Sequence, residues 1–169
     1  MSITIGITGH RFLPQDKLPQ IKQAVAAFFA EAKAMHGEII VLSSLAEGAD
    51  MICAELALEF GFRLVAPLPF DASEYRKDFP DNVAAQFDSM LAKIFQVFVV
   101  SPQEPVPSNP LRGFFYRQAG IYVATQCDIL LAIWDGAENN TSDGAGTWET
   151  IKIARNAGKQ IHYIGSVPL

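Results

Sequence analysis

Small, polar and basic residues gather directly after several apolar runs of this 169-residue sequence. The first group is Gly9-His10-Arg11, where glycine lets the backbone pass close to a ligand and arginine offers a planar fork that matches phosphate oxygens. The histidine could donate a hydrogen bond to such a ligand or serve as an acid or base. The alternative is structural, with His10 satisfied inside the fold and Arg11 paired with a neighbouring acid.

A second group is the stretch SSLAEGAD at residues 43–50. Its serines end an apolar run, its glycine permits a tight turn, and its last carboxylate falls in the first turn of an expected helix. A carboxylate there suits the helix dipole or holds a ribose hydroxyl. The candidate ligand-binding residues of this stretch are Ser43, Ser44, Glu47, Gly48 and Asp50.

A third group is GAGTWE at residues 144–149. Gly144 and Gly146 would let the backbone approach an anion, and the helix that follows would present free N–H groups and a partial positive charge. Thr147 adds a hydroxyl, although it could equally be only the cap of the helix. Glu149 is a candidate catalytic carboxylate, a ribose anchor, or a favourable acid at a helix start.

Two further polar positions follow the same logic. Asp135 comes directly after the fifth apolar run and is both a ligand-binding and a catalytic candidate. Arg112 and Arg117 lie near an expected helix start, and we take Arg117 as a ligand-binding candidate. Tyr75, Tyr116 and Trp148 could stack on a base, although packing in a core is the commoner use of such side chains.

Continuous apolar runs of strand length separate these groups, at residues 3–8, 38–44, 62–68, 95–100, 128–134 and 160–165. Helical patterns with three-and-four spacing alternate with them, which is typical of strands covered on both faces. The pattern predicts an α/β fold: a Rossmann-like three-layer α/β/α sandwich with a mostly parallel sheet of about six strands, in a single domain over residues 1–169. Residues 101–110 and 135–146 are predicted to be long loops.

In such a sheet all strands end at one edge, and ligands bind where neighbouring crossovers diverge. The three groups are therefore expected to meet there. The net charge of −5 disfavours a nucleic-acid partner that is held by a broad basic surface. Cys53 and Cys127 lack metal or redox spacing and are expected to be buried thiols, and no cofactor or metal is expected. With no membrane-length apolar run or signal segment, we expect a cytoplasmic protein.

Together, GITGHR, SSLAEGAD, AIWDG and GAGTWE resemble the SLOG superfamily along the whole sheet. This Rossmann-like group includes the Lonely guy phosphoribohydrolases, the lysine-decarboxylase-like proteins and DNA-processing protein A. The S-x-x-A-x-G-x-D pattern of the last is matched by Ser43, Ala46, Gly48 and Asp50, and the resemblance implies a pocket for nucleotide chemistry. Other members are thought to sense nucleotide-derived signals.

The Lonely guy motif PGGxGTxxE is matched here only in part. Gly144, Gly146 and Thr147 match its GxGT, but Thr150 occupies the position of the catalytic glutamate and Glu149 stands one residue earlier. One residue along a helix is about 100° around its axis. The departure favours ligand binding over hydrolysis.

The leading hypothesis is therefore a binding module, acting as a sensor, for a nucleotide or nucleotide-derived phosphate ligand at the carboxyl edge of the sheet. The alternative is a nucleoside 5′-monophosphate phosphoribohydrolase that cleaves the N-glycosidic bond with Glu149 or Asp135. A third reading is a structural subunit whose edge loops bind protein. A homodimer through the helix that carries Phe114, Phe115, Tyr122 and Val123 is a further hypothesis.

Overall fold

The apolar runs form one parallel sheet in the computed structural model, which describes residues 1–102 and 112–165. Its strands are β1 (Ser2–Gly9), β2 (Glu38–Leu42), β3 (Arg63–Leu68), β4 (Gln96–Val99), β5 (Ile129–Ile133) and β6 (Gln160–Ile164). Every pairing is parallel, in the order β4-β3-β2-β1-β5-β6. The predicted six-stranded Rossmann-like sheet is confirmed.

Helices connect successive strands, as the three-and-four spacing predicts. They are α1 (Leu18–Met35), α2 (Ala49–Glu59), α3 (Ala72–Tyr75), α4 (Asp81–Leu91), α5 (Arg112–Gln126) and α6 (Thr147–Asn156), with short 3-10 turns η1 (Gln15–Lys17) and η2 (Arg76–Asp78). The short elements α3 and η2 were not predicted, because four and three residues are too few to show a period. The proline-rich loop predicted at 101–110 lies almost wholly outside the described residues.

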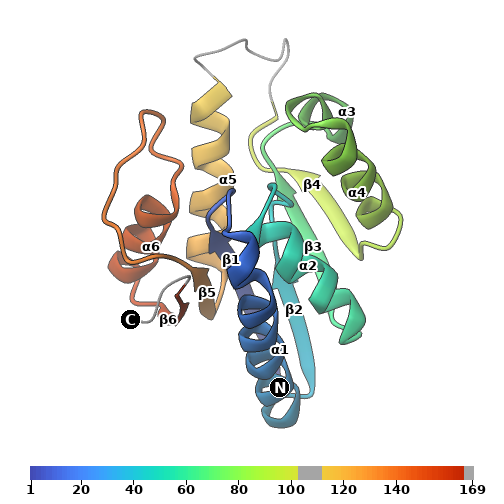
Figure 1. The fold of residues 1–169 in the computed structure, drawn as a ribbon, viewed down its shortest axis with the longest axis vertical. Coiled ribbons are helices and arrows are strands. Elements are labelled where there is room, and N and C mark those ends of the chain that lie inside the picture. The colour runs from blue at the N-terminus through green and yellow to red at the C-terminus, as the bar shows by residue number, and fades with distance from the viewer. Residues whose placement is uncertain (103–111, 166–169) are drawn as a thin grey trace.

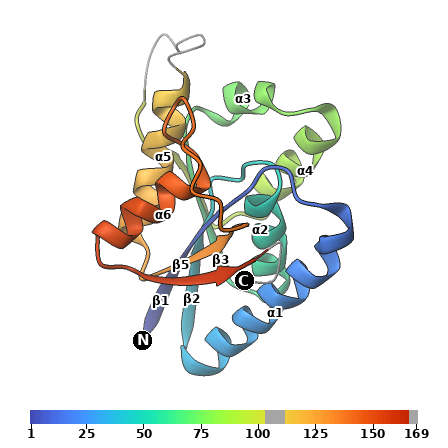
Figure 2. The ribbon, with the colours of Figure 1, turned by 60° about the vertical axis from the view of Figure 1, so that its left-hand side comes forward.

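The helices cover the two faces of the sheet as separate layers, which Figure 2 shows edge-on. Helices α1, α2 and α4 pack on one face, with Phe29 and Phe87 fully buried between them and the strands. Helices α5 and α6 pack on the other face around Leu130 and Ile151. Because both faces are covered, the strands need apolar side chains on both sides, which explains their continuous apolar runs.

Strand β1 lies between β2 and β5, and there the direction of the crossovers reverses (Figure 1). The chain leaves β1 for α1 on one face and leaves β5 for α6 on the opposite face. In a parallel sheet this reversal opens a crevice outside the carboxyl ends of the two strands. Gly9 and Ile133 are register partners at those ends.

Two predictions from the sequence concern which side chains are buried. Cys53 and Cys127 are free and buried, as expected. Of the α5 residues offered for a homodimer, Phe115 and Val123 are buried in this chain, whereas Phe114 is 55% exposed. The homodimer stays a prediction.

Within residues 1–102 and 112–165, no helix has both the length and the apolar character needed to span a bilayer.

Candidate functional site

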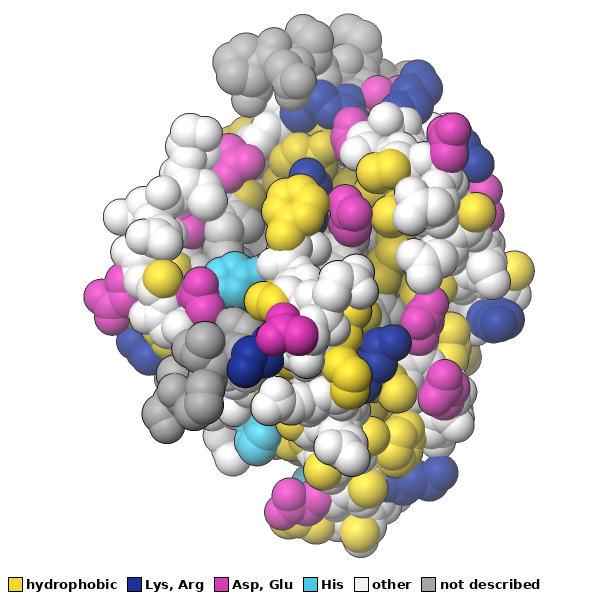
Figure 3. All heavy atoms as spheres, in the orientation of Figure 1, with side chains coloured by type: hydrophobic (Ala, Val, Ile, Leu, Met, Phe, Trp, Pro, Cys, Tyr) yellow, Lys and Arg dark blue, Asp and Glu magenta, His cyan; other side chains and the backbone are white. Residues whose placement is uncertain are grey.

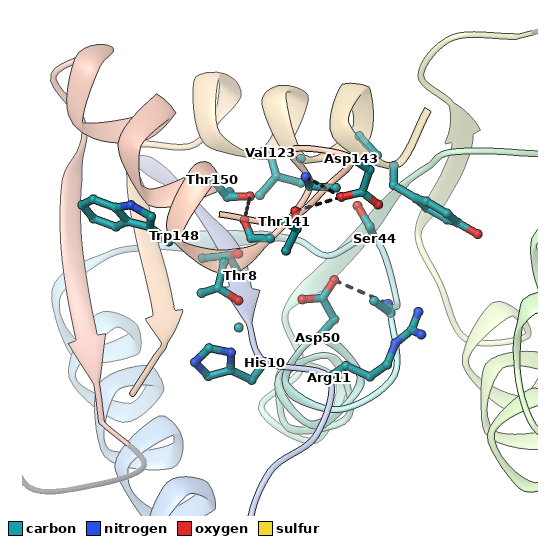
Figure 4. Close-up of a pocket in the computed structure, with 18 of the residues that line it drawn as sticks. Thr8, His10, Arg11, Ser44, Asp50, Val123, Thr141, Asp143, Trp148 and Thr150 are labelled. Carbon is teal, nitrogen blue, oxygen red and sulfur yellow. Dashed lines mark hydrogen bonds between the residues drawn. The ribbon is translucent and has the colours of Figure 1, made fainter. Parts of the chain in front are cut away.

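A cavity of about 790 Å³ lies at the carboxyl edge of the sheet, in the crevice between β1 and β5. Its walls come from the turn after β1, the start of α2, the loop before α6 and the inner side of α5. Figure 4 shows Thr8, His10 and Asp50 across the cavity from Thr141 and Thr150. The expected meeting of the strand-end groups is therefore observed.

The sequence-predicted site residues divide into two sets. Those that line the cavity are Gly9, His10, Arg11, Ser44, Glu47, Asp50, Asp135, Gly146 and Thr147. Those that lie behind its wall or beside it are Ser43, Gly48, Arg117, Gly144 and Glu149. The second set supports the loops that carry the first.

Gly9 brings β1, β5 and α2 into close contact at the floor of the cavity. A Cβ at this position would lie 2.4 Å from the Ala49 Cβ and 2.8 Å from the Ile133 Cβ. The backbone N–H of His10 donates to the Ile133 carbonyl at 3.3 Å, which carries the β1 pairing one residue past the strand. The glycine is needed here for packing, and it also exposes backbone to the cavity.

His10 and Asp135 join the ends of β1 and β5. The Nε2 atom of His10 lies 3.1 Å from Asp135 Oδ1 and 3.2 Å from the Asp135 backbone nitrogen. The backbone N–H of Ala137, which donates to Asp135 Oδ1 at 2.9 Å, and the nearby imidazole hold the pKa of Asp135 below its usual value. Asp135 is thus an ionised acceptor at neutral pH, not a proton donor.

The SSLAEGAD stretch folds into a compact turn ahead of α2. The buried Ser43 hydroxyl donates to the Asp50 carbonyl at 3.2 Å and accepts from the Leu45 N–H at 3.2 Å. Leu45 is fully buried with a positive φ of 55°, which a non-glycine residue adopts only when its surroundings enforce it. Gly48 lies against the backbone of the β1 turn, where the Ala49 N–H donates to the His10 carbonyl at 3.1 Å.

Asp50 is the buried carboxyl of the cavity, with 8% of its surface exposed. Its Oδ2 accepts from the Ala46 N–H at 3.4 Å. Burial raises the pKa of Asp50 to about 7, against the opposing effect of hydrogen bonds from the backbone N–H groups of Ala46 and Ser44. The group therefore exchanges its proton near neutral pH, unlike an ordinary aspartate.

The loop at 135–146 is fastened to the first turn of α6. The Thr141 N–H donates to Glu149 Oε1, and the Thr141 hydroxyl lies 3.2 Å from the same oxygen and 2.9 Å from Asp143 Oδ1. The other Glu149 oxygen is buried without a partner among the described residues and lies close to Gly146. Glu149 thus faces the loop backbone, so the sequence-predicted catalytic acid holds the loop that forms the wall.

The wall opposite β1 is closed by an ion cluster that the sequence did not reveal. Arg112 donates to Glu74 Oε1 at 2.9 Å and to both oxygens of Asp78 at 2.8 and 2.9 Å, and its guanidinium lies over the Phe70 ring. The Tyr116 hydroxyl also donates to Asp78. Burial, together with this bond, raises the pKa of Tyr116 to about 12, so its phenol keeps its proton.

The aromatic candidates are already engaged within the chain. The Trp148 ring stacks on Trp134 at 5.4 Å between centroids and 3° between planes, and Arg155 lies over the Trp148 ring. Tyr75 is buried against Phe79. Trp148 is also among the residues that line the cavity.

Acidic groups outnumber basic ones around the cavity. Its lining includes the carboxylates Glu47, Asp50, Asp78, Asp135 and Asp143, against the guanidinium of Arg11 and the imidazole of His10. On the face drawn in Figure 3, acidic and basic side chains are interspersed. An anionic ligand at this site must therefore be held by local hydrogen bonds and ion pairs more than by the overall electrostatic potential of the surface.

Two solved structures share this architecture. DNA processing protein A of Streptococcus pneumoniae superposes with a TM-score of 0.68 at 16% identity, over 99% of this chain and 52% of that one. DNA processing protein A of Helicobacter pylori superposes with a TM-score of 0.63 at 15% identity, over 95% of this chain and 64% of that one. The chain has a SLOG-like Rossmann fold. The resemblance found in its motifs is confirmed at the level of the fold.

This chain spans about half the length of the pneumococcal protein. No protein-family model matches its sequence. No curated protein matches it by sequence either. At 15–16% identity the likeness carries the fold and not the activity.

The expectation that a nucleic-acid partner is disfavoured is wrong. The structure of the H. pylori protein is described by its single-stranded DNA binding mode, so this fold accommodates nucleic acid. The physical reason is that the net charge of −5 averages over the whole surface, whereas a single strand is held by a few local contacts.

Proposed function

We propose that the cavity of this SLOG-like domain binds a nucleotide unit, with its phosphate directed to Arg11 and the start of α6. The observation that carries the proposal is a cavity of about 790 Å³ at the point where the crossovers after β1 and β5 diverge. Its volume is within the range of small-molecule sites, and its position is where open α/β sheets bind ligands.

Different groups of the cavity suit the phosphate of a nucleotide and its ribose or base. Arg11 has no ion-pair partner among residues 1–102 and 112–165, and its guanidinium borders the cavity. The backbone of Gly146 and Thr147, at the start of α6, offers N–H groups to a phosphate. The ionised carboxylate of Asp135 suits a ribose hydroxyl or an exocyclic amine of a base.

Arg11→Ala is expected to weaken the binding of AMP about tenfold, because the variant loses the one unpaired guanidinium of the described cavity wall. Isothermal titration calorimetry measures the dissociation constant. The matched control is Arg63→Ala, which removes an equal charge from an exposed pair with Glu38 at the other end of the strands. Equal dissociation constants for wild type and Arg11→Ala would show that the Arg11 guanidinium does not contact the ligand.

A nucleotide within a single strand is the second candidate ligand. It is favoured by the likeness to the H. pylori protein, whose structure concerns binding of single-stranded DNA. Fluorescence anisotropy of a labelled oligothymidylate, measured beside AMP, separates the two. Tighter binding of the oligomer, and a salt dependence that grows with its length, would identify the strand as the ligand.

Hydrolysis of the N-glycosidic bond is less well supported than binding. Of the two acids that the sequence predicts for protonating the leaving base, Glu149 is bonded to Thr141 and the pKa of Asp135 lies below its usual value. Chromatography of AMP after incubation with the protein tests this directly, since a hydrolase would release adenine and ribose 5-phosphate.

A further inference from the structure

Asp50 differs from the other carboxylates of the cavity in burial and in bonding. It is 8% exposed and forms no ion pair within the described part of the chain, while Asp135 contacts His10 and Asp78 contacts Arg112. One oxygen accepts from Ala46, and Figure 4 shows the carboxyl group directed into the cavity. A buried carboxyl that has no ion-pair partner and faces a binding cavity is therefore available to a ligand.

The groups around Asp50 do little to hold its negative charge. The other ionisable groups that line the same cavity are Arg11 and His10 in the turn after β1, Glu47 in the loop before α2, Tyr75 in α3, and Asp78, Tyr116, Asp135 and Asp143 in the remaining walls. Cys53 lies one turn along α2, and burial, with the nearby charge of Asp50, raises its pKa. An anionic ligand adds a further negative charge and expels water, and both effects favour the protonated carboxyl.

We propose that Asp50 is a specificity-determining residue that takes up a proton as ligand binds and, in its neutral form, donates a hydrogen bond to a phosphodiester oxygen. This inference rests on the proposed nucleotide site and names the group that recognises the phosphate there. A phosphodiester carries a single charge, which suits a cavity lined by five carboxylates better than a dianionic monoester does. Cyclic nucleotides and single strands both contain such a group.

The proposed uptake of a proton predicts how ligand affinity changes with pH. The pKa of Asp50 is about 7 in the free protein, and in the complex it is higher. Affinity is therefore constant below pH 7 and falls as pH rises above it, because the carboxyl must first be protonated. About nine-tenths of the molecules carry neutral Asp50 at pH 6 and about one-tenth at pH 8, so the dissociation constant rises about tenfold between them.

The experiment measures the dissociation constants of 3′,5′-cyclic AMP and of a fluorescein-labelled oligothymidylate at pH 6, 7 and 8. The phosphodiester groups keep one charge throughout this range. Wild type is expected to bind at least one probe about tenfold more weakly at pH 8 than at pH 6. Asp50→Asn, which imitates the neutral carboxyl, is expected to bind with wild-type pH 6 affinity at all three pH values. Asp16→Asn, at an exposed site in η1, is the matched control and should retain the wild-type pH profile.

Each contrary result identifies what fails. A flat profile in the wild type, tighter binding at pH 8, or weak binding by Asp50→Asn at pH 6 overturns the role of Asp50 and leaves the nucleotide site standing. Binding of AMP but of neither phosphodiester probe overturns the role of Asp50 alone, whereas binding of none of the three overturns the nucleotide site as well. Carbon-13 NMR of the aspartate carboxyls gives a test without ligand, because it measures the pKa of Asp50 in the free protein. A pKa near 4 for this carboxyl would contradict the inference.

Discussion

Replacing Gly48 by alanine is expected to lower the free energy of unfolding by about 3 kcal/mol or more, whereas the same change at Gly61 costs about 1 kcal/mol. Both glycines flank α2 and both have positive φ, 89° and 77°. A Cβ on Gly48 would lie 2.2 Å from the Arg11 carbonyl oxygen and 2.6 Å from that of His10, while a Cβ on Gly61 meets nothing within 4 Å. Gly48 thus adds a steric clash, and a ψ of −122° outside the left-handed α region, to the positive φ that the two glycines share.

Chemical denaturation of both variants measures the difference. Since the clash is with backbone that forms the cavity floor, Gly48→Ala should also weaken the binding of AMP, whereas Gly61→Ala should not. Equal losses of stability would mean that the turn after β1 moves aside freely, and the close contact between this turn and α2 would then have no energetic weight.

Replacing Arg112 by alanine is expected to cost about 2 kcal/mol of folding stability, because it leaves Asp78 with only the Tyr116 hydroxyl and Glu74 with only the exposed Lys77 as partners. The side chain of Arg112 is 10% exposed and also lies over the Phe70 ring, so packing is lost with the charge. The matched control is Arg76→Ala. Arg76 contacts both oxygens of Asp88 with half of its side chain exposed, so its loss is expected to lower stability much less than the loss of Arg112.

Thermal and chemical denaturation of the two arginine variants decides the matter. The Arg112 cluster joins α5 to η2 and thereby fixes one wall of the cavity, so hydrogen exchange in residues 72–78 should quicken in Arg112→Ala. If Arg112→Ala were as mild as Arg76→Ala, the cluster would be an ordinary surface pair despite its burial.

The sequence predicted the sheet well because burial on both faces leaves a strong signal. Runs such as ITIGIT and DILLAIW are continuous, strand-length and separated by helical periods, and that alternation permits few topologies. The rule that residues after successive parallel strands meet at one edge of the sheet then predicted that Gly9, Asp50 and Asp135 lie together. All three line the cavity although they are far apart in the chain. The rule works because it depends on position in the sheet and not on residue type.

Side-chain partners could not be predicted in the same way. Tyr116 and Asp78 are 38 residues apart, and nothing in either local pattern indicates their contact. Glu149 stands one residue from the motif position of the catalytic acid, and the sequence could not show that its carboxylate contacts Thr141. Net charge also failed for the partner class, since it contains no information about which charges face the cavity.

The place of β1 between β2 and β5 affects how the chain acquires its structure during synthesis. Strands β1 to β4 pair in sequence and can assemble early, but the second edge of β1 stays open until β5 emerges from the ribosome. Contacts such as the Thr4 N–H with the Asp128 carboxylate, which join residues 124 positions apart, must therefore form late. Until then β1 is the outermost strand of the partial sheet, and its apolar, unpaired edge is open to association with another incomplete chain.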